Sequence, residues 1–213
     1  MTDATRIKGV AAPLPLANLD TDQIMPKQFL RGIDKMGLAQ GLLYDLRFDG
    51  EGQARPEFVL NRPAFAATRM LIAGANFGCG SSREHAVWGL QQHGIQAVIA
   101  PSFGEIFYSN AMNNRLLLVM LEPDQVQALI DEAQASAEPM QVSIDLQTMT
   151  LQSPALQASF SLAERHRRMF LEGLDMIGAS LSHRDQIKAF AARHWAAQPW
   201  LRDVARITTE RLG

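Results

Sequence analysis

The sequence predicts an α/β protein with a mixed, largely parallel sheet followed by C-terminal helices. Three short apolar runs indicate buried strands, because each is brief and bounded by turn residues: Met70–Ala73, Ala97–Ala100 and Leu116–Leu121. Helical patterns lie between and after these runs, at Ser82–His93, Phe103–Asn113 and Pro123–Ser136. Alternation of strand and helix implies parallel strands joined by right-handed crossovers.

The part of the chain before this alternating region, residues 1–62, is less regular. It opens with a strand pattern near Ile7–Leu16 and continues into the polar stretch NLDTDQIMPKQFL. The stretch DLRFDGEGQARPEF that follows has the glycine, proline and charge density of an exposed loop. We therefore expect residues 1–62 to contribute one strand and long loops.

The part after the alternating region combines strands and helices. Two segments are typical of a strand pair, Gln141–Leu146 and Thr148–Gln152. Amphipathic helices follow near Leu162–Ile177 and Arg184–Ala196, and Pro199 marks the end of the second. We predict a single domain over residues 1–213, with a C-terminal helical extension over residues 163–213.

The composition excludes several classes of protein. Hydrophobic residues make up 47% and charged residues 20% of the 213 residues, which is ordinary for a globular chain. The formal net charge of −2 gives no basic field for a nucleic-acid partner. The longest apolar run, Leu116–Leu121, is far shorter than the roughly 20 residues of a membrane span, and the first residues lack the apolar core of a signal peptide. We expect a cytoplasmic protein with neither a nucleic-acid nor a membrane partner.

The sequence contains one cysteine, Cys79. It cannot form an intrachain disulfide, and it cannot by itself build a zinc or iron–sulfur site. We therefore predict no metal site in this chain. Because Cys79 stands between two glycines, we interpret it as a small filler rather than a reactive thiol.

The segment Gly74–His85 reads GANFGCGSSREH and lies between a predicted strand and a predicted helix. Open α/β sheets bind ligands at the carboxyl ends of their strands. Ser81 and Glu84 have the spacing of a capping box, so we expect the helix to begin near Ser81 or Ser82. Unpaired N–H groups at a helix start bind anions, and Arg83 adds a guanidinium suited to a carboxylate. The segment therefore predicts a site for a small carboxylate or phosphate.

Other motifs of this kind do not fit the same segment. A P-loop needs a lysine after its glycines, and the segment has none. The dinucleotide fingerprint needs a third glycine where Arg83 stands. A nucleophile elbow needs a glycine two residues after its serine, where Ser81 and Ser82 are followed by Arg83 and Glu84. The alternative to an anion site is that Gly74–His85 is only a tight strand-to-helix turn with an ordinary helix cap.

The stretch GCGSSREHA closely resembles the Gly-Ser-Ser-Arg-Glu-His signature of the swivelling domain of aconitase-type hydro-lyases, and above all the small subunits of isopropylmalate isomerases. Four further stretches match that family in order: Asn18–Leu30, Leu43–Asn61, Ala100–Asn114 and Phe170–Leu181. Residues 110–115, NAMNNR, depart from the family, which usually has a cysteine there and ends in Asn-Gly. The resemblance implies an aconitase-like swivelling domain with β/β/α layers.

The resemblance also implies an activity and a partner. The family interconverts 2-isopropylmalate and 3-isopropylmalate through isopropylmaleate, in leucine biosynthesis. Its Lewis acid is a [4Fe–4S] cluster that three cysteines of a separate large subunit hold. The single cysteine agrees with this division, since this chain cannot supply those ligands. We thus expect a hydro-lyase small subunit, in a heterodimer or larger assembly, that acts on a hydroxy-dicarboxylate.

Two alternatives stay open. One is the small subunit of a related isomerase of the homoaconitate or citraconate type. The other is a non-catalytic scaffold module in which the anion site only docks a partner or a metabolite.

Roles for individual residues follow from the resemblance. Ser81 would remove the substrate proton as an alkoxide, and Asp22 would orient residues of the site. Ser82 and Arg83 would bind a substrate carboxylate, and Arg31 lies about where the family has a further substrate-binding arginine. An alkoxide must be stabilised by N–H groups and cations, and the start of the helix is a site of that kind.

Overall fold

The computed structural model describes residues 5–30 and 37–212. The chain divides into two compact units, Met1–Gly173 and Leu174–Gly213. The sequence placed the start of the helical extension at residue 163, whereas helix α7 (Glu164–Glu172) lies in the first unit. The reason is burial, because Met169 and Phe170 of this helix are at most 9% exposed.

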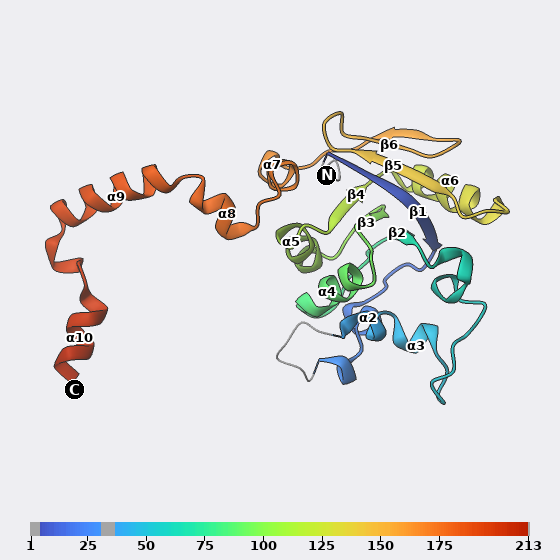
Figure 1. The fold of residues 1–213 in the computed structure, drawn as a ribbon, viewed down its shortest axis with the longest axis horizontal. Helices are drawn as coiled ribbons and strands as arrows, with labels where there is room; N and C mark the ends of the chain where they lie inside the picture. The colour runs from blue at the N-terminus through green and yellow to red at the C-terminus, as the bar shows by residue number, and fades with distance from the viewer. Residues whose placement is uncertain (1–4, 31–36, 213) are drawn as a thin grey trace. The chain divides into compact units, whose positions relative to one another are not determined.

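A seven-stranded sheet forms the centre of the first unit (Figure 1). The strand order is β4–β3–β2–β1–β5–β6–β7. Four strands run parallel: β1 (Arg6–Leu14), β2 (Thr68–Ala73), β3 (Ala97–Ala100) and β4 (Leu117–Met120). Three antiparallel strands extend the sheet beyond β1: β5 (Gln141–Asp145), β6 (Thr150–Gln152) and β7 (Gln157–Ser159). The predicted α/β fold with a mixed sheet is confirmed.

Helices on both faces explain the continuous apolar runs of the parallel strands. Helices α4 (Glu84–Gln92) and α5 (Glu105–Asn113) lie on one side of the sheet, and α6 (Pro123–Ala135) packs on β1, β2 and β3 from the other (Figure 1). All four residues of β3 are therefore buried. Strand β5 instead alternates between buried and more exposed residues, as expected where one face of a sheet is open.

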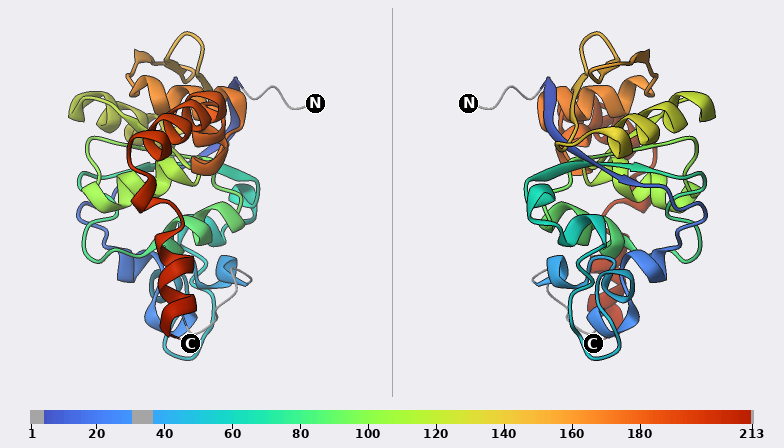
Figure 2. Two further views of the ribbon diagram at one scale, coloured as in Figure 1. Left: turned by 90° about the vertical axis from the view of Figure 1, so that its left-hand side faces the viewer. Right: turned by 90° about the vertical axis from the view of Figure 1, so that its right-hand side faces the viewer.

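Short helices fill the long connection between β1 and β2. They are α1 (Thr21–Ile24), η1 (Lys27–Phe29), α2 (Leu38–Gly41), α3 (Tyr44–Arg47), η2 (Val59–Asn61) and η3 (Pro63–Phe65). Both views of Figure 2 place α2 and α3, in light blue, at the end of the first unit opposite the β5–β6 hairpin. This connection leads from the carboxyl end of β1 across to the start of β2.

The predicted capping box at Ser81 and Glu84 is wrong. Helix α4 begins at Glu84, and its N-cap is Arg83, which is extended at φ −124° and makes no side-chain cap bond. The Glu84 carboxylate instead accepts a hydrogen bond from the Asn114 amide, at the end of α5. A capping box does occur at α1, where Asp20 and Gln23 bond each other's backbone N–H groups.

The second unit consists of helices α8 (Met176–Leu181), α9 (Arg184–Ala197), η4 (Pro199–Leu201) and α10 (Val204–Leu212). The predicted helix Leu162–Ile177 is interrupted, because Gly173 takes the left-handed conformation at φ 66° and ends α7. Helix α10 lies within the predicted helical extension of residues 163–213, although the sequence pattern defines no individual helix after Pro199. None of the residues of α8, α9 and α10 is buried. Over the residues that the structure describes, no helix has both the length and the apolarity to cross a membrane.

Candidate functional site

Two loops at the carboxyl ends of β1 and β2 run side by side and form the candidate site. Three backbone hydrogen bonds, with N···O distances between 2.8 and 2.9 Å, join residues 18–21 to residues 75–79. Asp20 and Cys79 form a parallel β-bridge, so the two loops continue the direction of the strands before them. The stretch NLDTD and the stretch GCGSS, far apart in the sequence, are thereby brought into contact.

The loop after β3 completes this edge. Phe77 donates its N–H to the Ser102 carbonyl at 3.1 Å, and its own carbonyl accepts from the Gly104 N–H at 2.9 Å. Gly78 is needed between these contacts, because its φ is +75° and a Cβ there would lie 2.3 Å from the Phe107 ring. Hydrogen bonds therefore hold the glycine-rich loop after β2 between the loop after β1 and the loop after β3.

Ser81 and Ser82 are exposed at the end of the glycine-rich loop, just before α4. Thr21, which is 1% exposed, donates its hydroxyl to the Ser81 carbonyl at 2.9 Å. Among the described residues, the backbone N–H groups of Ser81, Ser82 and Arg83 have no hydrogen-bond acceptor. Exposed hydroxyls and unpaired N–H groups at the start of α4 make this a place where an anion can bind.

Asp22 and Arg83 form an ion pair across the two loops. The Arg83 side chain is largely buried at 17% exposure, whereas that of Asp22 is 41% exposed. The second Asp22 oxygen lies 4.0 Å from the ammonium of Lys27. Arg83 and Lys27 thus place two cations beside the Asp22 carboxylate.

The structure therefore brings four of the five predicted site residues to one edge of the sheet: Asp22, Ser81, Ser82 and Arg83. Arg31 lies outside the described residues. Two further residues join the group, Thr21 through its bond to Ser81 and Lys27 through Asp22. The sequence signal for Thr21 was weak, because a threonine beside aspartates is equally typical of a local turn.

Cys79 contributes to the loop contact rather than to a metal site. It is partly buried, and its thiol lies 3.3 Å from the Asn18 carbonyl that accepts its hydrogen bond. Within residues 5–30 and 37–212, no group of three or more histidine, cysteine, aspartate or glutamate side chains could hold a metal ion.

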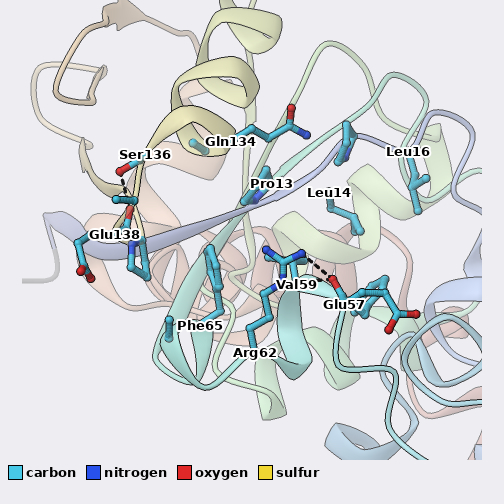
Figure 3. Close-up of a pocket in the computed structure, with 16 residues that line it drawn as sticks. Pro13, Leu14, Leu16, Glu57, Val59, Arg62, Phe65, Gln134, Ser136 and Glu138 are labelled. Carbon is cyan, nitrogen blue, oxygen red and sulfur yellow. Dashed lines mark hydrogen bonds between the residues drawn. The ribbon is translucent and has the colours of Figure 1, made fainter.

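A cavity of about 570 Å³ lies away from these residues, beside the end of β1 (Figure 3). Its walls come from residues 13–16, residues 57–65 and the end of α6, and none of the predicted site residues lines it. The Arg62 guanidinium donates to the Glu57 carbonyl at 2.8 Å, and the Ser136 hydroxyl donates to the Glu138 carbonyl at 2.6 Å. These donors already bond to carbonyl groups of the lining itself. The two loops at the ends of β1 and β2 therefore remain the candidate site.

Comparisons with known proteins agree with the fold. Residues 1–124 match the family model described as the aconitase C-terminal domain. Residues 176–204 match the model described as the C-terminal domain of the 3-isopropylmalate dehydratase small subunit. The fold and the first match thus define an aconitase-type domain of the hydro-lyase class.

Individual relatives narrow the class. A 3-isopropylmalate dehydratase small subunit of Chromobacterium violaceum is 68% identical over 212 residues, which cover 100% of both chains. The corresponding subunit of Phenylobacterium zucineum is 49% identical over 92% of this chain and 97% of that protein. The crystal structure of a 3-isopropylmalate dehydratase of Methanocaldococcus jannaschii aligns with a TM-score of 0.62 at 28% identity, covering 87% of this chain and 99% of that one. The chain belongs to the 3-isopropylmalate dehydratase small subunit family.

Proposed function

We propose that this chain is the small subunit of a hydro-lyase that converts 2-isopropylmalate into 3-isopropylmalate through isopropylmaleate, in leucine biosynthesis. The observation that carries the proposal is the contact between the two loops. It gathers an exposed serine pair, unpaired N–H groups and the Asp22–Arg83 ion pair at one edge of the sheet. This set suits a substrate with two carboxylates and a C–H proton to be removed.

The proposed chemistry of this chain begins with binding. Arg83 and the N–H groups of Ser81 and Ser82 would hold a substrate carboxylate through charge-assisted hydrogen bonds. Asp22 would keep the Arg83 guanidinium in one orientation, since the two side chains are already paired. The expected result is that the C–H bond of the substrate lies against the Ser81 hydroxyl.

Ser81, as an alkoxide, would then take the C–H proton and become a hydroxyl, and this hydroxyl would give the proton back to carbon during rehydration. A serine hydroxyl is a weak acid at neutral pH, so the developing oxyanion needs nearby positive charge. The start of α4, Arg83 and Lys27 supply that charge within this chain. Thr21 holds the backbone of Ser81 in place through its hydroxyl.

The proposal requires a large subunit. Loss of the substrate hydroxyl calls for a Lewis acid, which in this family is a [4Fe–4S] cluster, and one cysteine cannot hold such a cluster. The residues of this chain therefore do not fit the cluster, and we assign it to the large subunit. The exposure of Ser81 and Ser82 supports a site that is closed by another chain.

The test is reconstitution of this chain with a 3-isopropylmalate dehydratase large subunit, followed by an assay of isopropylmaleate hydration. We expect activity from the pair and none from the isolated chain. Ser81→Ala should reduce turnover by several orders of magnitude while the two subunits still co-elute in size-exclusion chromatography. Ser159→Ala, a matched change at an exposed serine of β7, should leave turnover unchanged.

Two results would contradict the proposal. Turnover of the Ser81→Ala pair at the normal rate would exclude Ser81 as the base. If the reconstituted pair prefers a homoaconitate or citraconate substrate over isopropylmalate, the chain is instead the small subunit of a related isomerase.

A further inference from the structure

A groove of about 580 Å³ lies at the amino ends of the parallel strands, on the edge of the sheet opposite the loop site. Its lining comes from the starts of β1 and β2, from the residues just before β3 and β4, and from α4, Leu146 and α7. Four of the lining residues are cations, Arg6, Lys8, Arg69 and Arg115, and none is acidic. The function proposed above makes no use of this charge.

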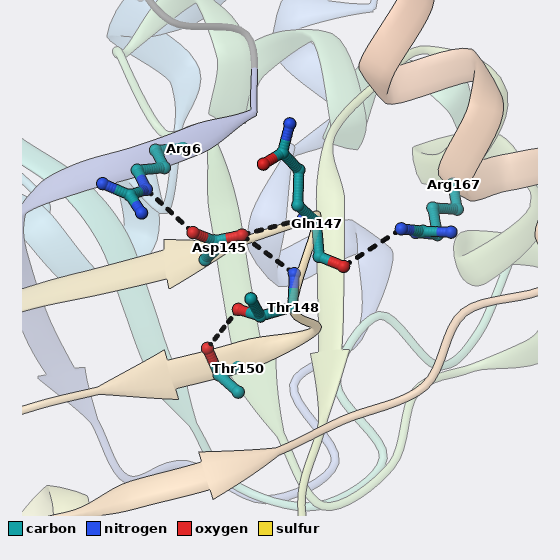
Figure 4. Close-up of polar contacts among 6 residues, drawn as sticks. All are labelled: Arg6, Asp145, Gln147, Thr148, Thr150 and Arg167. Atoms are coloured by element: carbon teal, nitrogen blue, oxygen red, sulfur yellow. Dashed lines mark hydrogen bonds and ion pairs between the residues drawn. The ribbon is translucent and has the colours of Figure 1, made fainter.

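One of the four cations is already neutralised. The Arg6 Nε atom donates to the Asp145 carboxylate at 2.8 Å, as Figure 4 shows. The other Asp145 oxygen accepts from the N–H groups of Gln147 and Thr148. Asp145 is therefore fully engaged, and it does not offset the charge of the remaining three cations.

Lys8 and Arg69 are exposed and have no acidic partner among the described residues. Neither side chain makes an ion pair or a hydrogen bond with any residue that the structure describes. The backbone favours this arrangement, because an added Cβ at Gly9 would lie 2.7 Å from Cδ of Arg69. The glycine in the middle of β1 thus leaves room for the Arg69 side chain to lie across the strand.

Arg115 gives an independent reason to regard the groove as built for a ligand. Its φ is +61°, a left-handed conformation that costs a residue with a side chain about 1–2 kcal/mol. Strained backbone of this kind is often retained where the side chain has a role. One Nη atom of Arg115 donates to the Gly173 carbonyl at 2.9 Å, and its other donors remain available.

The floor of the groove is apolar. Ile95 and Leu146 are each 1% exposed, Phe170 is 9% exposed, and Ile7 is partly buried beside them. The amides of Gln91 and Gln96 also contribute to the lining. A ligand for this groove therefore combines several negative charges with a compact body that contacts Ile7 and Phe170.

We infer that the groove binds a small phosphorylated metabolite whose phosphate groups contact Lys8, Arg69 and Arg115. Guanidinium groups bind phosphate oxygens in pairs, and several cations in one groove match the higher charge of a phosphorylated ligand. The site is separate from the loop site, because the two occupy opposite ends of the same parallel strands. The inference does not depend on the proposed function.

The test is isothermal titration calorimetry of the full-length chain with inorganic pyrophosphate as probe, at low ionic strength. We expect saturable binding that weakens as salt screens the cations, and the groove contribution is the part that substitution of the groove cations removes. Arg69→Gln and Lys8→Gln should each weaken binding about tenfold or more, since each removes a charge-assisted hydrogen bond. Arg69→Lys, which keeps the charge, should bind more tightly than Arg69→Gln.

A control variant locates the bound ion. Arg55→Gln removes an exposed arginine outside the groove and should leave the affinity unchanged. Absence of saturable binding, or unchanged affinity in the Lys8 and Arg69 variants, would overturn the inference. Circular dichroism of every variant checks that the fold is retained.

Discussion

The hydroxyl of Thr21 donates to the carbonyl of Ser81 at 2.9 Å, and 60 residues of chain separate the two. Thr21 is 1% exposed, so this bond is shielded from water on the threonine side. It fixes the backbone of the proposed base to the loop that carries Asp22. Thr21 is therefore a positioning residue. Its role can be tested by a substitution that leaves the proposed substrate-binding groups unchanged.

Thr21→Val should lower the kcat of the reconstituted enzyme, with a smaller change in KM, because Ser81 loses its fixed position. The variant keeps the size of the side chain and removes one hydrogen bond, which costs about 1 kcal/mol of stability. Thr21→Ser retains the hydroxyl and should recover most of the kcat. A valine variant with normal kcat and a lowered melting temperature would mean that the bond is only structural.

Replacement of Asp22 by asparagine should weaken catalysis through Arg83. The amide keeps the shape of the side chain but removes the charge that orients the largely buried guanidinium. We expect kcat/KM for isopropylmalate to fall about tenfold or more, the loss expected from one charge-assisted hydrogen bond. Asp49→Asn, in the exposed loop before β2, is a control for the loss of one negative charge. Equal kinetics in the two variants would contradict the positioning role of Asp22.

Much of the fold was predictable because the parallel strands are buried on both faces. The runs at Ala97–Ala100 and Met70–Ala73 are apolar throughout, which is the pattern that such burial imposes. Strand β7 was missed because its three residues, Gln157–Ser159, are too few to establish a period. The break at Gly173 was missed because the amphipathic pattern continues across it.

The sequence predicted which residues belong to the candidate site, but it did not predict the contacts between them. The glycines and serines of Gly74–His85 indicate an anion site by local chemistry alone. The capping box expected at Ser81 failed because Glu84 bonds Asn114 of the neighbouring helix instead. Such a partner is distant in the sequence, so no local pattern can reveal it. The same holds for the bond between Thr21 and Ser81.

Position 115 offers a test of backbone strain. Arg115 has a φ of +61°, where glycine is favoured and any other residue is strained. Arg115→Gly and Arg115→Ala both lose the hydrogen bond to the Gly173 carbonyl, so their difference isolates the backbone term. The glycine variant should be about 1 kcal/mol more stable than the alanine variant, or about 2–4 °C higher in melting temperature. Equal melting temperatures would show that this turn relaxes without cost.

The pH dependence of stability should report the bonds to Asp145. Hydrogen bonds from the Thr148 N–H and the Arg6 guanidinium, together with the Gln147 N–H, lower the pKa of this carboxyl from 3.8 to about 2. A folded-state pKa below the unfolded one means that the charged carboxylate stabilises the fold at any pH above about 4. That contribution is lost as the pH falls from about 4 to about 2, because the unfolded chain takes up a proton on this carboxyl while the folded protein does not.

Asp145→Asn should remove this contribution. The difference in unfolding free energy between the original chain and the variant, measured by urea denaturation, should be constant above about pH 4 and shrink toward pH 2. Arg6→Gln should give a weaker version of the same change, because the bond from Thr148, the largest cause of the lowered pKa, remains. A difference between Asp145→Asn and the original chain that does not vary with pH would show that the carboxylate gains nothing from these bonds.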